Sequence, residues 1–243
     1  MNITRDKAPD VIRGFALLGI LVVNIQYMAL SAEGVTSEWV KGAANGSAAF
    51  IVSTLFSGKF YLMFSLMYGY SSSYILKGEK SNLKRWIKRC IFFIVLGFLH
   101  AISLWQGDIL FWYGVFGLFL SFFFFRSDKT LKRWNWGLYL LSNITLLTLS
   151  ALILITALLG NAKKTAPEKQ PLDTVLLDGS FLDIAKARLD FWTSTSLSAV
   201  LLQGGLAFAA FLLGIRLSRR KYFSNTGDPS RRKKLMVLGV SIG

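Results

Sequence analysis

Cysteine and histidine are nearly absent from this chain of 243 residues, which contains one of each, Cys90 and His100. A single cysteine excludes a disulfide bond within the chain. One histidine and one cysteine cannot supply a His/Cys zinc site, so no metal is expected. The chain also lacks the Gly-x-Ser-x-Gly elbow of serine hydrolases and any glycine pattern that cradles phosphate. Acidic residues are scarce as well, with 13 against 28 lysines and arginines.

Long apolar runs are what the chain does contain. Hydrophobic residues make up 53% of it, and several runs reach the roughly 20 residues that a bilayer-spanning helix needs. The sequence therefore predicts an all-α, polytopic transmembrane helical bundle that forms a single domain. An amphipathic stretch at 43–56 precedes the second span. Six spans are expected, at about residues 11–30, 59–76, 86–105, 109–125, 136–159 and 193–215.

The two ends of the chain raise separate questions. Residues 235–243 resemble the beginning of a seventh span, because nine residues cover less than half a bilayer as a helix. This abrupt end predicts that the chain is a fragment or a natural truncation. The first span has an alternative interpretation as a cleaved signal peptide, since small residues follow its apolar run near Ala32. Its length and its polar residues Asn24 and Gln26 favour a retained span.

The basic residues that give the net charge of +15 are unevenly distributed along the chain. Most basic residues lie at the N-terminus and in the connections after the second, fourth and sixth spans, whereas acids balance bases elsewhere. The positive-inside rule then places the N-terminus and these basic connections in the cytoplasm. The expected partners are the lipid bilayer and anionic lipids, and no nucleic acid; the oligomeric state stays open. An external loop is expected at about 161–192, ending in an amphipathic surface helix at 181–192.

His100 and Asp108 are the candidate catalytic residues. A lone titratable group within an apolar run is a functional-site candidate, and His100 falls near the outer end of the third span. Asp108 follows in a short turn with Trp105, where a carboxylate can fix the tautomer of an imidazole and raise its basicity. Contact between the two requires the turn to fold back. The residues alone also fit a hydrogen-bonded strut.

Four further residues are candidate substrate-binding positions, together with Trp105. Asp10 and Arg13 lie three apart at the start of the first span, so one helical face presents both. They can hold an anionic group at the cytoplasmic surface or serve as a topology anchor. Asn24 can bond a neighbouring helix or contact substrate, and Lys59 can bind a ligand or extend to the interface.

Three motifs stand out, DVIRGFALLGILVVN at 10–24, KFYLMFSLMYG at 59–69 and GFLHAISLWQGDILFWYG at 97–114. They resemble the YeiB-like family of bacterial membrane proteins, a domain-of-unknown-function family, over residues 5 to about 125. That resemblance implies that the protein lies in a bacterial inner membrane and that family members continue through several more spans than this chain has.

The family in turn resembles membrane acyltransferases that modify sugars and envelope glycans. Those enzymes pass an acyl group from a cytoplasmic donor such as acyl-CoA to an acceptor on the far side, helped by a histidine. The resemblance implies roles for Asp10, Arg13, His100 and Asp108, although the histidine falls at a different place here. An O-acyltransferase is therefore the leading hypothesis. A proton-coupled transporter or permease of a small solute and an inactive fragment are the alternatives.

Overall fold

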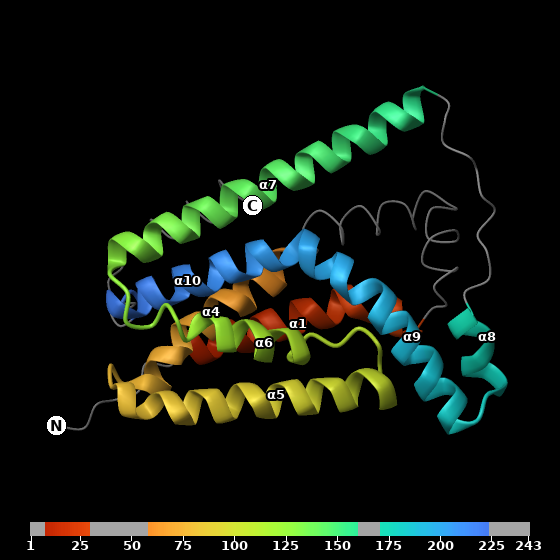
Figure 1. Ribbon diagram of the computed structural model, residues 1–243, viewed down its shortest axis with the longest axis horizontal. Helices are drawn as coiled ribbons and strands as arrows, with labels where there is room; N and C mark the ends of the chain where they lie inside the picture. The colour runs from red at the N-terminus through yellow and green to blue at the C-terminus, as the bar shows by residue number, and fades with distance from the viewer. Residues whose placement is uncertain (1–7, 30–57, 160–170, 224–243) are drawn as a thin grey trace.

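The computed structural model describes residues 8–29, 58–159 and 171–223, and every regular element in those ranges is helical (Figure 1). The all-α prediction is confirmed for this part of the chain. The amphipathic stretch at 43–56 and the start of a seventh span lie outside the described residues. The elements are α1 (Ala8–Ala29), α4 (Lys59–Leu76), η2 (Lys80–Asn82), α5 (Leu83–Ser103), α6 (Leu110–Leu120), α7 (Asp128–Leu158), α8 (Pro171–Asp178), α9 (Phe181–Ala199), η3 (Val200–Gly204) and α10 (Gly205–Arg219).

Four helical runs within the described residues are long and apolar enough to cross a membrane, which indicates a membrane protein. They are Ala8–Ile25, Lys80–Ser103, Asp128–Leu158 and Phe181–Arg219. The expected second span corresponds to α4, and the expected fourth span to α6, which has only 11 residues. The count of six spans therefore stays a prediction.

The fourth predicted span ends earlier than the apolar run suggests. Helix α6 stops at Leu120, and the following residues form turns rather than a helix to residue 125. The amide of Ser121 bonds the carbonyl of Leu118, three residues back, and the Ser121 hydroxyl donates to the same carbonyl at 2.5 Å. This local competition for carbonyl groups favours turns over a continued helix.

The packed centre of the bundle consists of α4, α5, α6 and α10. Helices α4 and α10 approach so closely that a Cβ atom at Gly69 would collide with the carbonyl group of Phe211, and one at Gly214 with that of Leu66. Small residues allow such close approach between helices in lipid. Helix α1 packs on α4, where the rings of Phe15 and Phe60 meet with centroids 5.4 Å apart.

The predicted surface helix and sixth span form one helical run, Phe181–Arg219. Figure 1 shows this run bending between α9 and α10, where the π-helical segment η3 lies. A π segment disturbs the regular hydrogen-bond ladder, which accounts for the bend. The predicted surface helix is thus the first part of a bent helix that continues through η3 into α10.

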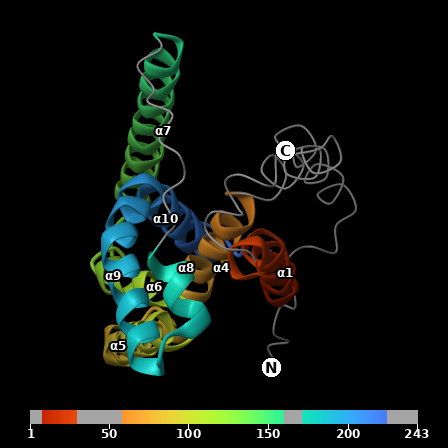
Figure 2. The same ribbon diagram turned by 90° about the vertical axis from the view of Figure 1, so that its right-hand side faces the viewer.

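Helix α7 diverges from the packed centre along its length. Figure 2 shows it projecting away from the other helices, and Leu131 in its second turn is its one buried residue. The start of α7 is held to α10, since Asp128 contacts Arg216 at 3.1 Å and Arg220 at 3.0 Å. Asn135 also donates to the carbonyl of Ala209 at 2.6 Å.

The basic connections gather at one end of the molecule. Helices α1, α5 and α7 begin at this end and α4, α6 and α10 finish there (Figure 1). The predicted alternation of charge therefore agrees with the helix directions. The side of the membrane that this end faces stays a prediction.

Candidate functional site

His100 and Asp108 meet at the opposite end, where α5 turns into α6. The Nδ1 atom of His100 lies 2.9 Å from Oδ2 of Asp108. Neither atom has another partner among the described residues, and the ring N–H is not aimed straight at the oxygen. The turn at 104–109 thus folds back as the predicted contact requires.

Asp108 is fixed by the helix that follows it. Its Oδ1 accepts a hydrogen bond from the backbone N–H of Phe111 at 2.8 Å, which satisfies one of the free donors at the start of α6. The two oxygens of the carboxyl group therefore face different elements: Oδ1 accepts the bond at the start of α6, and Oδ2 faces the imidazole on α5.

Gly97 makes this arrangement sterically possible. It lies one turn before His100 on α5, and a Cβ atom there would collide with the backbone N of Phe111 and lie 2.6 Å from Oδ1 of Asp108. The start of α6 therefore rests directly on the α5 backbone. Gly97, His100 and Asp108, which share one sequence motif, form one spatial unit.

The two members of the pair differ in exposure. The side chain of Asp108 is fully buried, whereas that of His100 is 35% exposed. Burial raises the pKa of the Asp108 carboxyl above its usual value, and the bonds from Phe111 and His100 oppose that rise. Since Nδ1 faces the carboxylate, the other ring nitrogen, Nε2, is left for a group outside the pair.

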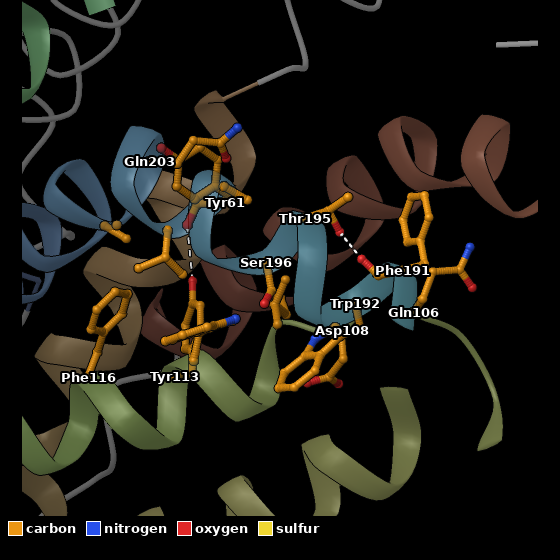
Figure 3. A pocket seen from close by; sticks show the side chains of 17 residues that line it. Tyr61, Gln106, Asp108, Tyr113, Phe116, Phe191, Trp192, Thr195, Ser196 and Gln203 are labelled. Carbon is orange, nitrogen blue, oxygen red and sulfur yellow. Dashed lines mark hydrogen bonds between the residues drawn. The ribbon is translucent and has the colours of Figure 1, made fainter. Parts of the chain in front are cut away.

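A cavity of about 270 Å³ adjoins the buried side of Asp108 (Figure 3). Its walls come from the 106–109 turn, α6, α9, η3 and α10, with Tyr61 of α4. His100 is not among the lining residues. Asp108 therefore separates the imidazole from the cavity and contacts both.

The other predicted binding residues do not join this site. Trp105 is nearest, half-buried in the turn, with its ring over Gly107. Asp10 and Arg13 form the predicted pair at 3.3 Å, but at the opposite end of the bundle, where α1 begins. Asn24 is half-buried on α1, and Lys59 is exposed at the first position of α4.

Several motif residues serve packing between helices. The Ser65 and Tyr113 hydroxyls lie 2.6 Å apart, and Tyr68 donates to the carbonyl of Tyr113 at 3.2 Å. Trp86 donates to the carbonyl of Gly117 at 2.8 Å. These bonds join α4, α5 and α6, which places the 97–114 motif on a rigid support.

Sequence reasoning missed the aromatic wall of the cavity. Trp112 and Trp192 both line it, and their rings lie 6.4 Å apart although 80 positions separate them in the chain. The ring of Phe111 also meets that of Trp192 edge-on, with centroids 4.9 Å apart. The one available signal was the placement of Trp192 at the end of an amphipathic stretch, which does not predict what it contacts.

Two curated proteins are similar to the chain, and both are uncharacterised. YxaH of Bacillus subtilis is 29% identical over 260 aligned positions, which cover 96% of this chain and 63% of YxaH. YeiB of Escherichia coli is 32% identical over 118 residues, 47% of this chain and 30% of YeiB. The chain thus spans less than two thirds of the length of either relative. These similarities support a YeiB-like family.

No family model matches the chain. No solved structure matches it either.

Proposed function

We propose that the chain carries the histidine half of a membrane O-acyltransferase. The observation that supports this is the His100–Asp108 pair, with a buried carboxylate at Nδ1 and a partly exposed ring. This is the arrangement of a general base whose tautomer is fixed by a carboxylate. Because the chain spans 63% of YxaH, the activity of the complete protein is part of the proposal.

The proposed reaction uses an acyl thioester such as acyl-CoA. The Nε2 atom of His100 takes the proton of an acceptor hydroxyl while its oxygen attacks the acyl carbonyl carbon. A C–O bond forms and the C–S bond breaks, and the leaving thiolate takes up the proton. Asp108 acts as a positioning residue, since it stabilises the imidazolium formed during the step.

Asp10 and Arg13 contribute at the other end of the bundle in this proposal. Arg13 offers a cation at the basic end, where the anionic part of the donor would arrive. The two pairs lie at opposite ends, so the donor has to extend along the bundle, with its thioester intact, for the acyl carbonyl to reach His100.

The test follows radiolabelled acetyl groups from acetyl-CoA into lipid and glycan fractions of membranes that contain the full-length protein. Replacing His100→Ala should abolish the transfer, and Asp108→Asn should reduce it strongly and shift its pH profile. Trp136→Phe, an exposed change on α7, serves as the matched control. Undiminished transfer in His100→Ala membranes with equal protein content would overturn the proposal.

A proton-coupled transporter is the second candidate, favoured by the buried carboxyl beside a cavity. Buried acid and histidine groups in membrane proteins relay protons. Solute uptake that follows an imposed pH gradient, without a labelled covalent product, would support this candidate and reject acyl transfer.

A further inference from the structure

A second cavity, which we call the α7 groove, lies between α7, α4 and α10. Its volume is about 570 Å³, against about 270 Å³ for the cavity beside Asp108. Most of its wall is aliphatic, and includes Leu62, Met63 and Leu66 of α4 and Leu206, Ala210 and Leu213 of α10. Lipid tails are as apolar as these side chains, so the wall is complementary to hydrocarbon.

The groove exists because α7 is held to α10 only near its start. Asn135 donates to the carbonyl of Ala209 at 2.6 Å, and beyond this contact α7 projects away from the other helices (Figure 2). Tyr139, one turn further along α7, lines the groove and is 46% exposed. The aliphatic wall residues on α4 and α10 are half-buried. The groove is therefore accessible from the outside of the bundle, where a membrane supplies lipid.

The length of the groove matches one leaflet of a bilayer. It follows α10 from Arg216, at the basic end, back to Leu206. Ten residues of an α-helix rise by about 15 Å, which is half of the roughly 30 Å of a hydrocarbon core. A membrane-spanning helix is about twice as long as the groove, whereas one lipid chain crosses only its own leaflet. The length thus favours a lipid chain as the occupant.

The basic end of the groove carries excess positive charge. Arg216 is in the wall, with a side chain only 11% exposed, and contacts Asp128 at 3.1 Å. Arg220, one turn further along α10, contacts the same carboxylate at 3.0 Å and is 62% exposed. Lys132 is exposed on α7, three positions before Asn135 and on the same helical face. One carboxylate therefore faces three cations, and an anionic headgroup is favoured here.

From these observations we infer that the α7 groove binds one anionic phospholipid. A hydrocarbon chain lies along the aliphatic wall, and the phosphate lies beside Arg220 and Lys132. The sequence predicts anionic lipids as partners of the basic end in general, and the groove assigns one of them to a defined place. This site is separate from the His100–Asp108 pair at the other end of the bundle, so it does not depend on acyl transfer.

The test titrates the full-length protein in a non-ionic detergent with phosphatidylglycerol or with phosphatidylcholine of equal chain length. Native mass spectrometry counts the bound lipids. The first phosphatidylglycerol should bind at least about fivefold more tightly than the first phosphatidylcholine. Ala210→Phe places a ring in the groove and should weaken phosphatidylglycerol binding clearly. Lys132→Gln removes one cation, so it should weaken phosphatidylglycerol binding about fivefold and leave phosphatidylcholine binding unchanged.

Two matched controls should bind phosphatidylglycerol as the unchanged protein does. Ala151→Phe adds the same ring at an exposed position of α7 outside the groove, and Lys186→Gln removes a charge from α9 at the opposite end of the bundle. Gel filtration and circular dichroism verify folding. If Ala210→Phe fails to fold, Lys132→Gln, which is an exposed change, provides the test.

Three results would each overturn the inference. The first is equal affinity for the two lipids, and the second is undiminished phosphatidylglycerol binding in either folded variant. The third is displacement of phosphatidylglycerol by an equal concentration of palmitoyl-CoA, which would assign the groove to an acyl donor. All readouts are lipid-binding constants, so they stand whether or not acyl transfer is observed.

Discussion

The two ends of the bundle each carry an acid paired with a basic residue, and the pairs differ in almost every physical respect. Asp10 and Arg13 are separated by three positions on α1, and both side chains contact solvent or lipid, with 46% and 29% exposed. His100 and Asp108 come from two sides of a turn, and the carboxyl is fully buried. Spacing on one helix creates the first pair, and tertiary packing creates the second.

That difference indicates which of the two pairs can support catalysis. An exposed pair is screened and stabilises a protein by at most about 1 kcal/mol. The buried carboxyl of Asp108 accepts a hydrogen bond from Phe111 on one oxygen, and its other oxygen faces His100 at 2.9 Å. The second pair is therefore part of the fold, since the bond from Phe111 fixes the carboxyl that faces the imidazole.

The largest effect is expected from Asp108→Ala. The change removes both the cap of α6 and the partner of Nδ1, and breaking a buried pair typically destabilises by about 3–5 kcal/mol. The midpoint of thermal unfolding of the purified protein should fall clearly. Asp190→Ala, at an exposed position of α9, should leave the midpoint unchanged. Equal midpoints for the two variants would show that Asp108 does not stabilise the fold, and the two acid–base pairs would then not differ in this respect.

Gly97→Ala is expected to destabilise by about 1–3 kcal/mol, the usual range for overpacking. The new Cβ would collide with the backbone N of Phe111, so the start of α6 would have to shift. Gly137→Ala on α7 is the matched control, since its Cβ would meet nothing within 4 Å. There the change should be neutral or stabilising by about 0.5–1 kcal/mol. Chemical denaturation followed by tryptophan fluorescence compares the two variants.

His100→Ala should destabilise less than Asp108→Ala, by about 1–3 kcal/mol. It leaves Oδ2 of Asp108 without its partner but preserves the bond from Phe111 that caps α6. The thermal unfolding midpoints of the two variants, measured side by side, show which substitution destabilises the protein more. The reverse order would show that His100 rather than Asp108 is the structural anchor.

Asp10→Asn should change stability least, by less than about 1 kcal/mol. Its pair with Arg13 is exposed, so added salt should reduce even this difference. The measurement is the thermal midpoint at low and high ionic strength. A shift that matches that of Asp108→Ala would mean that the exposed pair also supports the fold.

Much of the helical architecture follows from the sequence. Apolar runs predict the long helices of the described ranges but not α8 (Pro171–Asp178), which lies in the expected external loop. Spacing predicts the contact between Asp10 and Arg13. The contact between His100 and Asp108 is predicted only if the turn between them folds back. The role of Gly97 explains why that condition is met, because only a residue without a Cβ lets α6 start against α5.

Other features depend on contacts that a linear pattern does not contain. The end of α6 at Leu120 results from carbonyl bonds around Ser121 within an unbroken apolar run. The cavity joins α6 to α9, so Trp112 and Trp192 meet only after the fold forms. Hydropathy likewise marks α7 and α5 as similar spans, although α7 has one buried residue and α5 has four.

The π-helical segment η3 sets the rotational phase of α9 relative to α10. An α-helix turns by about 100° per residue, and a π turn accommodates one more residue than an α turn. Deleting a single residue from Val200–Gly204 would therefore rotate α9 about its own axis by roughly that angle. Trp192 would leave the cavity and Arg188 would leave the carbonyl of Ser103, which it now bonds at 2.6 Å. In related sequences, a one-residue gap at this position would mark a protein whose cavity is lined by a different face of the same helix.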